Sequence, residues 1–255
     1  MGFLVGALSG YLTDFAKEAL PPGLLLDAAS TEVVKMTVLR ERNQSIQGEE
    51  WLIEPAAFDA HPEVEKNLAK RTQERDDWDS FHKMMYDAGA FDANYTFVKL
   101  IVEGRRNSPV LVTGMRALIK RRNSPSPSMI AIGSGGESGA SVGKVGFNLD
   151  EANPVARIVP DAPTGTAPLG PPYFGEFTVT LANREQQVFQ VIANTAENDV
   201  EWTIELAIQV DGEERRFEVD NNGQPFRTSV RIQELSRYER VWYYDFEEGD
   251  FNRVR

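Results

Sequence analysis

The strongest constraint on the fold lies in residues 202–210, where apolar and polar side chains alternate. The apolar positions are Trp202, Ile204, Leu206, Ile208 and Val210. Because successive side chains of a β-strand point to opposite faces of its sheet, this alternation predicts a strand with one face in a core and the other in water. Asp211 and Gly212 follow at once, and this dipeptide tolerates the positive φ angles of a tight type I′ turn. The segment therefore predicts a β-hairpin in a half-buried antiparallel sheet.

Several other segments have the composition of strands. Residues 31–42 and 49–54 are rich in apolar and β-branched side chains, residues 95–122 form two long apolar runs around a turn, and residues 175–226 contain four strands. This spacing predicts a mainly β chain, an antiparallel β-sandwich of Ig-like or jelly-roll-like type. Residues 160–172 hold too much proline and glycine for regular structure, so they form either a linker between two domains or a long crossover within one sandwich.

A helical pattern interrupts the strands at residues 62–88. Pro62 suits the first position of a helix, and Gly89 suits the position after its end. Apolar side chains recur at the three- and four-residue spacing of one helical face, at Val64, Leu68, Trp78, Phe81 and Met85. We therefore expect one long amphipathic helix with a buried stripe and a charged, solvated face.

The N-terminal residues predict a hydrophobic helix that ends at Pro21 and Pro22. Its first thirteen residues carry no charge, yet as a helix they span only about 20 Å, less than the hydrocarbon core of a membrane. The segment also lacks the basic start of a signal peptide. One face carries glycines at the four-residue spacing found where transmembrane helices pack closely, at Gly2, Gly6 and Gly10. Three interpretations stay open: the end of a longer transmembrane helix, an interfacial anchor, or a helix packed on the domain.

Charge and residue types exclude several chemistries. The 255 residues carry a formal net charge of −12, which argues against nonspecific binding of nucleic acid or anionic lipid, because both require a cationic surface. Two short basic clusters, Arg105 with Arg106 and residues 120–122, are expected to be solvated hairpin ends. The chain has no cysteine and only two histidines, His61 and His82, so we predict no cofactor and no metal site.

The glycine-rich segment between Gly133 and Lys144 resembles a phosphate-binding loop only superficially. A P-loop requires a glycine five residues before its Gly-Lys pair and a hydroxyl group after it. Ser138 and Val145 stand at those two positions, and Ser138 also breaks the dinucleotide pattern that starts at Gly133. We therefore predict a flexible connection between two strands, and no nucleotide site.

Two acidic groups allow an enzymatic alternative. They are Asp76, Asp77 and Asp79 in the helical segment, and Asp245, Glu247, Glu248 and Asp250 near the C-terminus. A glycan hydrolase needs two carboxylates about 5 to 10 Å apart with separated pKa values. Exposed charges on the helix and a solvated tail are the favoured interpretation.

The C-terminal residues are unusually aromatic. Among charged residues lie Tyr238, Trp242, Tyr243, Tyr244 and Phe246, followed by Phe251. Aromatic rings beside carboxylates suit sugar rings and protein interfaces, so these residues are candidate ligand or interface residues. The alternative is a last element that packs its rings into the domain.

From about residue 78 to residue 229 the chain resembles a group of uncharacterised actinobacterial proteins. The resemblance rests on VKLIVEGRRNSPVLVTGMR, GFNLDEANPVAR and, most specifically, DVEWTIELAIQVDGEERRFEVDNNGQPFRTS. Members of that group join a membrane or DNA-binding N-terminal part to a β-rich C-terminal domain. The resemblance implies a module displayed beyond a membrane segment, and it implies no activity.

These observations predict a chain of three parts. Residues 1–22 form an anchor helix, residues 23–229 a β-sandwich domain with a helical insertion at about 62–88, and residues 230–255 an aromatic extension. We expect a non-enzymatic, membrane-proximal module with an extracytoplasmic domain that binds a protein or glycan partner, with membrane contact through residues 1–20. The alternatives are a glycan hydrolase and a cytoplasmic scaffold or subunit of a larger assembly.

Overall fold

A computed structural model describes residues 32–40, 50–70, 78–125, 129–132, 143–160, 168–245, 247–248 and 250–254. The expected N-terminal helix, with Gly2, Gly6 and Gly10, lies outside the described residues, as does Phe246. In the part that is described the chain is mainly β, as the sequence predicts. None of the helices in these ranges is long and apolar enough to cross a membrane.

Fifteen strands make up most of the part of the chain that the structure describes. They are β1 (Val34–Arg40), β2 (Glu50–Ile53), β3 (Phe91–Ala93), β4 (Tyr95–Gly104), β5 (Val110–Asn123), β6 (Met129–Ile132), β7 (Lys144–Asn148), β8 (Arg157–Ile158), β9 (Val179–Leu181), β10 (Gln186–Asn194), β11 (Asp199–Val210), β12 (Glu213–Val219), β13 (Phe226–Ser229), β14 (Val241–Asp245) and β15 (Asp250–Arg253). The helices are α2 (Pro55–Ala60), α3 (Pro62–Leu68), α4 (Trp78–Asp87) and α5 (Tyr173–Glu176), with a 3-10 turn at Leu235–Arg237.

The strands form two sheets, and both are mixed. A five-stranded sheet has the order β1-β4-β10-β7-β8, and a ten-stranded sheet runs β15-β14-β6-β2-β3-β13-β11-β5-β9 with β12 beside β11. Most neighbours are antiparallel, but β7 and β10, β3 and β13, and β6 and β14 are parallel. The expectation of a purely antiparallel fold is therefore wrong, because these pairs join segments that return to the sheet through long connections rather than hairpins.

The five-stranded sheet packs against β5, β9, β11, β12 and β13 around one shared core, and we call this part the two-sheet body. Trp202 lies at its centre, with Phe147 and Phe226 in contact with its ring. The apolar positions that alternate along β11 are all buried, as predicted, although the intervening Thr203 is buried too. Asp211 and Gly212 have φ angles of 51° and 82°, so the predicted tight hairpin between β11 and β12 is confirmed.

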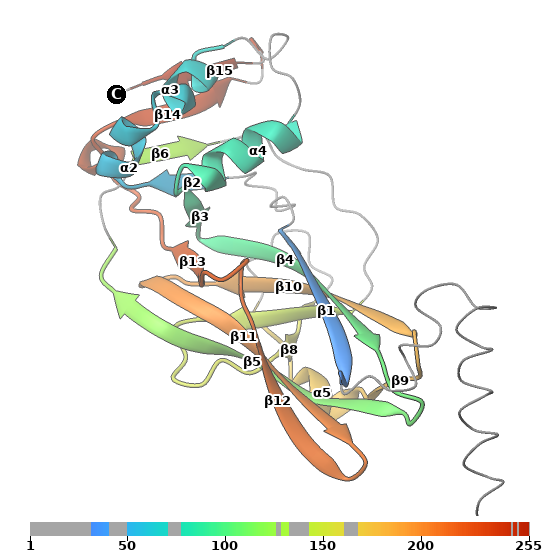
Figure 1. Ribbon diagram of the computed structural model, residues 1–255. Coiled ribbons are helices and arrows are strands. Elements are labelled where there is room, and N and C mark those ends of the chain that lie inside the picture. The colour runs from blue at the N-terminus through green and yellow to red at the C-terminus, as the bar shows by residue number, and fades with distance from the viewer. Residues whose placement is uncertain are drawn as a thin grey trace, which may run out of the picture.

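A second, smaller part lies above the two-sheet body in Figure 1 and contains the described α-helices other than α5. It consists of α2, α3, α4, β2, β6, β14 and β15, and we call it the helical unit. The expected single helix over residues 62–88 is wrong. Asn67 of α3 donates a hydrogen bond from Nδ2 to Sδ of Met84 in α4 at 3.1 Å, whereas seventeen residues of one straight helix would separate these positions by about 25 Å. The segment folds back on itself, and each helix buries its own stripe.

Candidate functional site

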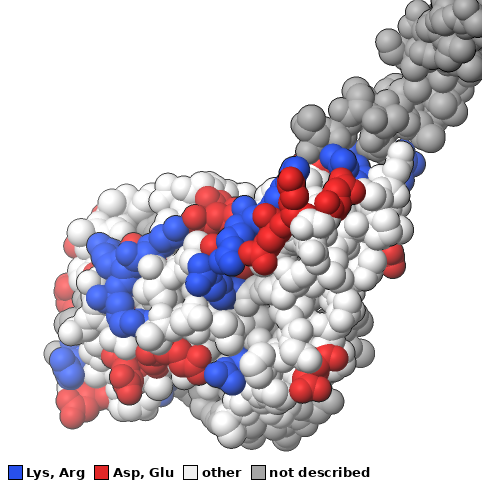
Figure 2. Space-filling model, turned by 90° about the horizontal axis from the view of Figure 1, so that it is seen from below, with Lys and Arg blue, Asp and Glu red and all other residues white. Residues whose placement is uncertain are grey.

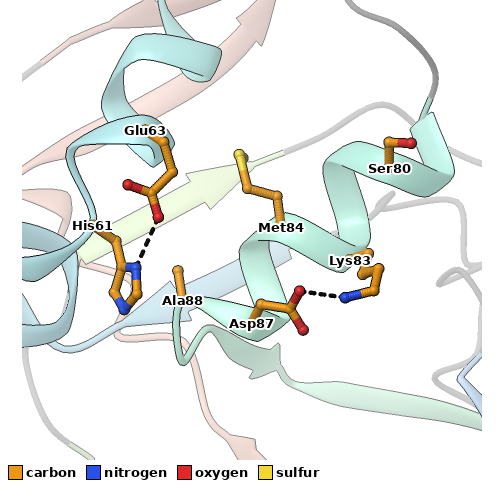
Figure 3. Close-up of a pocket in the computed structure, with 7 residues that line it drawn as sticks. All are labelled: His61, Glu63, Ser80, Lys83, Met84, Asp87 and Ala88. Carbon is orange, nitrogen blue, oxygen red and sulfur yellow. Dashed lines mark hydrogen bonds and ion pairs between the residues drawn. The ribbon is translucent and has the colours of Figure 1, made fainter.

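A groove separates α3 from α4 on the surface of the helical unit (Figure 3). It encloses about 290 Å³ and is lined by His61, Glu63, Ser80, Lys83, Met84, Asp87 and Ala88. Pro55 starts α2, and Pro62 starts α3. Gly89, with a φ of 86°, follows the end of α4 and turns the chain into β3. The fold thus brings residues at the start of α3 and residues along α4 to one concave surface.

The charged side chains that line the groove pair with one another. His61 Nδ1 and Glu63 Oε1 lie 2.8 Å apart, and Lys83 donates to Asp87 one helical turn further on. The pKa of Glu63 is lowered, first by a hydrogen bond from its own backbone N–H and then by the one from His61. A catalytic general acid needs the opposite, a carboxyl with a raised pKa.

The hydroxyl and the imidazole that line the groove do not point toward one another. Ser80 and His61 lie at opposite ends of it in Figure 3. Among the described residues no group of three histidine, aspartate or glutamate side chains is placed to hold a metal ion.

The acidic residues near the C-terminus have a structural role. Asp245 Oδ1 accepts hydrogen bonds from the backbone N–H groups of Glu247 and Glu248, at 2.8 and 3.2 Å, and so closes the turn between β14 and β15. Glu247, Glu248 and, in α4, Asp79 are exposed. Asp76 and Asp77 lie outside the described ranges.

Most of the candidate aromatic residues are buried. Tyr238 is fully buried and its hydroxyl accepts a hydrogen bond from the backbone N–H of Ile232. Trp242 and Tyr244 lie in a core beneath the helices, where Phe81 of α4 stacks on Phe251 of β15. Trp242 and Tyr244 cannot meet a ligand, because the sheet turns their rings towards the helices rather than towards solvent. Tyr238 is buried in a separate cluster, with Leu52 and Phe91.

Tyr243 is the exception. It points to the other face of β14 and is 46% exposed. The C-terminal strands therefore form the sheet beneath the helices of the helical unit, and among the described candidate rings that of Tyr243 remains accessible.

The five-stranded sheet presents a second surface that the sequence did not mark as a site. Along β4, and along β10 from Val188 onward, every second side chain is buried in the core, and the others are half-buried. We define the outer face as these outward side chains of β1, β4, β10 and β7. Its apolar members are Leu39, Tyr95, Phe97, Ile101, Val188 and Ile192, with Leu39 48% exposed.

The strand register arranges the outer face in rows. Thr37, Ile101 and Val188 lie side by side in one row, and Phe97 pairs with Ile192 in another. Between them runs a polar row in which Lys99 and Lys144 flank Gln190. Leu39 extends this row onto β1.

Charged side chains also lie on the outer face. Among the described residues its outward positions carry Lys35, Lys99, Lys144 and the carboxylate Glu103. Hydrogen bonds from Arg105 and Gln186, at 2.8 and 2.7 Å, lower the pKa of Glu103 and hold it ionised but paired.

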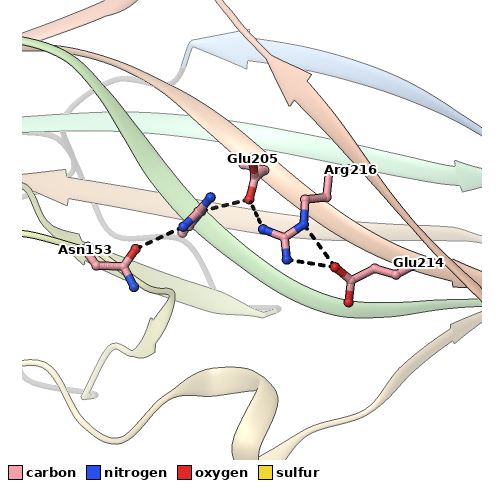
Figure 4. A network of polar contacts seen from close by, with 5 residues as sticks. Asn153, Glu205, Glu214 and Arg216 are labelled. Atoms are coloured by element: carbon pink, nitrogen blue, oxygen red, sulfur yellow. Dashed lines mark hydrogen bonds and ion pairs between the residues drawn. The ribbon is translucent and has the colours of Figure 1, made fainter.

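On the outer surface of β5, β11 and β12 the charges neutralise one another. Glu205 accepts hydrogen bonds from Arg116 and Arg216, and Arg216 also binds Glu214, while Arg116 reaches Asn153 (Figure 4). Burial acts to raise the pKa of Glu205, but the two arginines outweigh it and the pKa is lowered. Figure 2 shows positive and negative side chains interleaved in the same way over the lower end of the molecule.

The basic clusters at the hairpin ends are paired as well. Arg106 contacts Asp211, Lys120 contacts Glu218, and Arg121 contacts Glu201. Neither cluster forms a free cationic patch.

The strands on either side of the glycine-rich segment are formed as predicted. Most of the connection lies outside the described residues, but β6 and β7 frame it and Val145 is buried in the core. Gly143 has a φ of 60°, and its carbonyl accepts a hydrogen bond from Gln190 at 3.2 Å, so it docks the start of β7 on β10. Lys144 then points to the outer face.

Comparison of the chain with models of known protein families and with curated proteins finds no match. The function is therefore inferred from the two surfaces described above, the groove and the outer face.

Proposed function

We propose that the protein is a non-enzymatic β-sandwich module that is held near a membrane by its N-terminal residues and binds a partner outside the cytoplasm. The observation that carries the binding role is the outer face, with its two apolar rows. Contiguous apolar surface on one face of a sheet is typical of an interaction site, because exposing it to water costs free energy that a partner removes.

A protein partner fits this geometry better than a glycan partner. Sugar binding needs accessible aromatic faces, and Tyr238, Trp242 and Tyr244 are buried. The apolar rows of the outer face are mostly aliphatic, which suits the side chains of another protein.

The membrane part of the proposal rests on the uncharged N-terminal segment with Gly2, Gly6 and Gly10 and on the resemblance to actinobacterial modules that follow a membrane segment. A cytoplasmic scaffold would use the same outer face without membrane contact. The glycan hydrolase is less well supported, because the one carboxylate of the groove with a shifted pKa, Glu63, is shifted away from acid catalysis.

The binding role is tested by site-specific photo-crosslinking in the native host. A photoreactive residue replaces Thr37 or Val188 on the outer face, and the matched control replaces Gln209 on the surface of β11, which is exposed as Thr37 is. We expect one discrete crosslinked protein from both outer-face positions and none from the control. The same products from all three positions, or none from any, would contradict a binding role for the outer face.

The membrane role is tested by flotation of the full-length chain with liposomes. We expect the chain to float with the vesicles and a chain that starts at residue 32 to stay in the soluble fraction. A full-length chain that remains monomeric in buffer and enters neither liposomes nor detergent micelles would show that the anchoring part is wrong.

A further inference from the structure

We infer that Asn222 is a site of spontaneous deamidation and that the carboxylate of Asp220 restrains the reaction. Asn222 precedes Gly223 in the short connection between β12 and β13. Both residues are exposed to solvent. The inference is independent of the proposed binding role, because it concerns the chemistry of this turn alone.

The turn has a backbone that suits this pair of residues. The φ angles are 55° at Asn222 and 86° at Gly223, and asparagine and glycine are the residue types that tolerate such positive values best. Asn221 and Gln224 close the turn with two backbone hydrogen bonds, of 2.8 and 3.3 Å. No atom of the described residues lies within 4 Å of the place that a Cβ would take on Gly223, so this side of the turn is open.

The reaction joins the backbone nitrogen of Gly223 to Cγ of Asn222. The nitrogen gives its proton to solvent and forms the new N–C bond, and the side-chain amide nitrogen leaves as ammonia. Water then opens the resulting five-membered succinimide at one of its two carbonyls. Opening at Cγ gives aspartate, and opening at the backbone carbonyl gives isoaspartate, in which the main chain runs through the former side chain. Water is the only co-reactant, and nothing is oxidised or reduced.

Asp220 acts on the nitrogen that has to react. The backbone N–H of Gly223 donates a hydrogen bond to Oδ1 of Asp220 at 2.8 Å. This bond favours the protonated form of the nitrogen, and the carboxylate opposes a second negative charge beside it. The loss of the proton therefore becomes harder, and removal of Asp220 should accelerate the reaction.

Asn94 provides an internal comparison, because it has a positive φ of 62° as well. Its side-chain amide donates to Glu50 at 3.1 Å and accepts a hydrogen bond from the backbone N–H of Arg231 at 2.9 Å. The residue is only partly exposed, and Tyr95 rather than glycine follows it. These contacts hold the amide in place, and the tyrosine side chain crowds the following nitrogen, so we expect Asn94 to stay intact.

The test incubates the full-length chain at mildly alkaline pH and follows its peptides by mass spectrometry. Conversion of an amide to a carboxylate raises the mass, and enzymatic methylation specific for isoaspartate identifies the second product. We expect both products in the peptide that contains Asn222 and neither in the peptide that contains Asn94. The variant Asn222→Gly, which keeps a residue that tolerates positive φ, should lose both products.

Variants of Asp220 measure its restraint. Asp220→Ala removes the acceptor and the charge, and we expect the reaction to become roughly threefold faster or more, the factor that a hydrogen bond of ordinary strength supplies. Asp220→Asn keeps an acceptor and removes only the charge, so its rate should lie between those of Asp220→Ala and the wild type. The matched control Glu213→Ala removes an exposed carboxylate at the other end of β12 and should leave the rate unchanged. Near-UV circular dichroism establishes that the variants are folded.

Two sets of results would overturn the inference. An intact Asn222 in both the wild type and Asp220→Ala, or equal accumulation of products at Asn94, would show that the turn is not a modification site. A slower reaction in Asp220→Ala would show that the carboxylate takes the proton from Gly223 instead of restraining its loss. A rate that changes equally in Glu213→Ala would remove the specific role of Asp220.

Discussion

Individual polar residues inside the two-sheet body explain why its core has one arrangement. Trp202 donates from Nε1 to the Thr228 hydroxyl at 2.9 Å, and that hydroxyl lies 2.6 Å from the hydroxyl of Thr96. All three side chains are buried, and they come from β11, β13 and β4. Because a buried donor without an acceptor costs free energy, this chain of bonds fixes how the two sheets align.

Replacing Thr228 with valine should destabilise the protein. The change keeps the shape but leaves the Trp202 indole N–H and the Thr96 hydroxyl without their partner, so we expect a loss of about 2 to 4 kcal/mol in the free energy of unfolding. Urea denaturation measures it. Thr228→Ser, which retains the hydroxyl, should cost only about 1 kcal/mol, and equal stability of the valine variant and the wild type would refute the role of this chain of bonds.

Asp150 organises the connection between β10 and β11 through its carboxylate. It accepts hydrogen bonds from the Ala196 backbone N–H, the Thr195 hydroxyl and the Asn198 amide, at 2.7 to 2.8 Å. Partial burial acts to raise the pKa of Asp150, but these hydrogen bonds outweigh it and the pKa is lowered. A lowered pKa means that the folded state favours the ionised carboxylate.

The Asp150→Asn variant should therefore lose stability in a pH-dependent way. The contribution of the ionised carboxylate is complete above about pH 4, the ordinary range of an aspartate, and it is lost as the pH falls further. We expect a difference from wild type of about 1 kcal/mol near neutral pH, since the group is only partly buried, and a smaller difference below pH 4. Denaturation curves across this range measure it, and a difference that grows on acidification would contradict the assignment.

At the scale of elements, β14 and β15 complete the helical unit. Their inward side chains Trp242, Tyr244 and Phe251 share a core with Trp51 of β2 and Phe81 of α4. The outward Tyr243 of the same strand is exposed. The two C-terminal strands thus form the sheet on which α3 and α4 pack, and this packing positions the two helices that line the groove.

Alanine substitutions at adjacent positions of β14 should differ sharply. Trp242→Ala opens a large cavity beneath the helices, so we expect a loss of about 3 to 5 kcal/mol. Tyr243→Ala removes a ring that is mostly in solvent, so its cost should stay within about 0.5 kcal/mol. Chemical denaturation followed by far-UV circular dichroism compares the two, and similar losses would show that the described burial of Trp242 is wrong.

At the scale of the whole molecule, arginines tie the helical unit to the two-sheet body. Arg227 of β13 donates to both carboxylate oxygens of Asp199 and to Glu54 beside α2, and its guanidinium lies 3.6 Å from the centre of the Phe91 ring. Nearby, Arg231 donates to the buried Glu50 at 2.6 Å. The ten-stranded sheet also continues through β3 and β13, so the two parts share backbone hydrogen bonds as well as charges.

Arg40 of β1 is a third arginine that links the two parts, and it belongs to the five-stranded sheet. Its guanidinium lies 4.0 Å from the centre of the Tyr86 ring in α4 and 3.7 Å from Asp92 in β3, and Tyr86 donates its hydroxyl to the same carboxylate. With these links in place, we expect the molecule to unfold as one cooperative unit.

Native-state hydrogen exchange should show this cooperativity. Peptides from α4 and from β10 should lose protection at the same denaturant concentration in the wild type. Arg227→Met leaves the buried Asp199 carboxylate without its cation, at a cost of about 3 to 5 kcal/mol, and should make the helical unit open first.

Arg240→Met is the matched control for this experiment. Arg240 is exposed to a similar degree, but it pairs with Asp59 within the helical unit. The control should leave the two sets of peptides coupled. Separate opening of the helical unit in the wild type would contradict the expectation.

The local pattern of side chains determined most of the elements. The alternation in residues 202–210 predicted β11, the Asp211-Gly212 dipeptide its turn, and Gly89 the end of α4. These features depend on the period of the side chains and on allowed backbone angles, which act over a few residues.

The tertiary structure decided the number of helices, the pairing of distant strands and the burial of individual side chains, which local patterns do not contain. The same spacing of apolar residues fits one long helix or two packed ones, and the contact between Asn67 and Met84 distinguishes them. Parallel pairing of β6 with β14, and burial of Trp242 beside an exposed Tyr243, depend on which distant strands meet. The outer face was not predicted for the same reason. Apolar side chains on both sides of β4 predict a central strand, and a sequence does not record that, among the described strands, only one side of β4 packs against a second sheet. Local periodicity thus determined where the strands run, and long-range packing decided which side chains became core and which became surface.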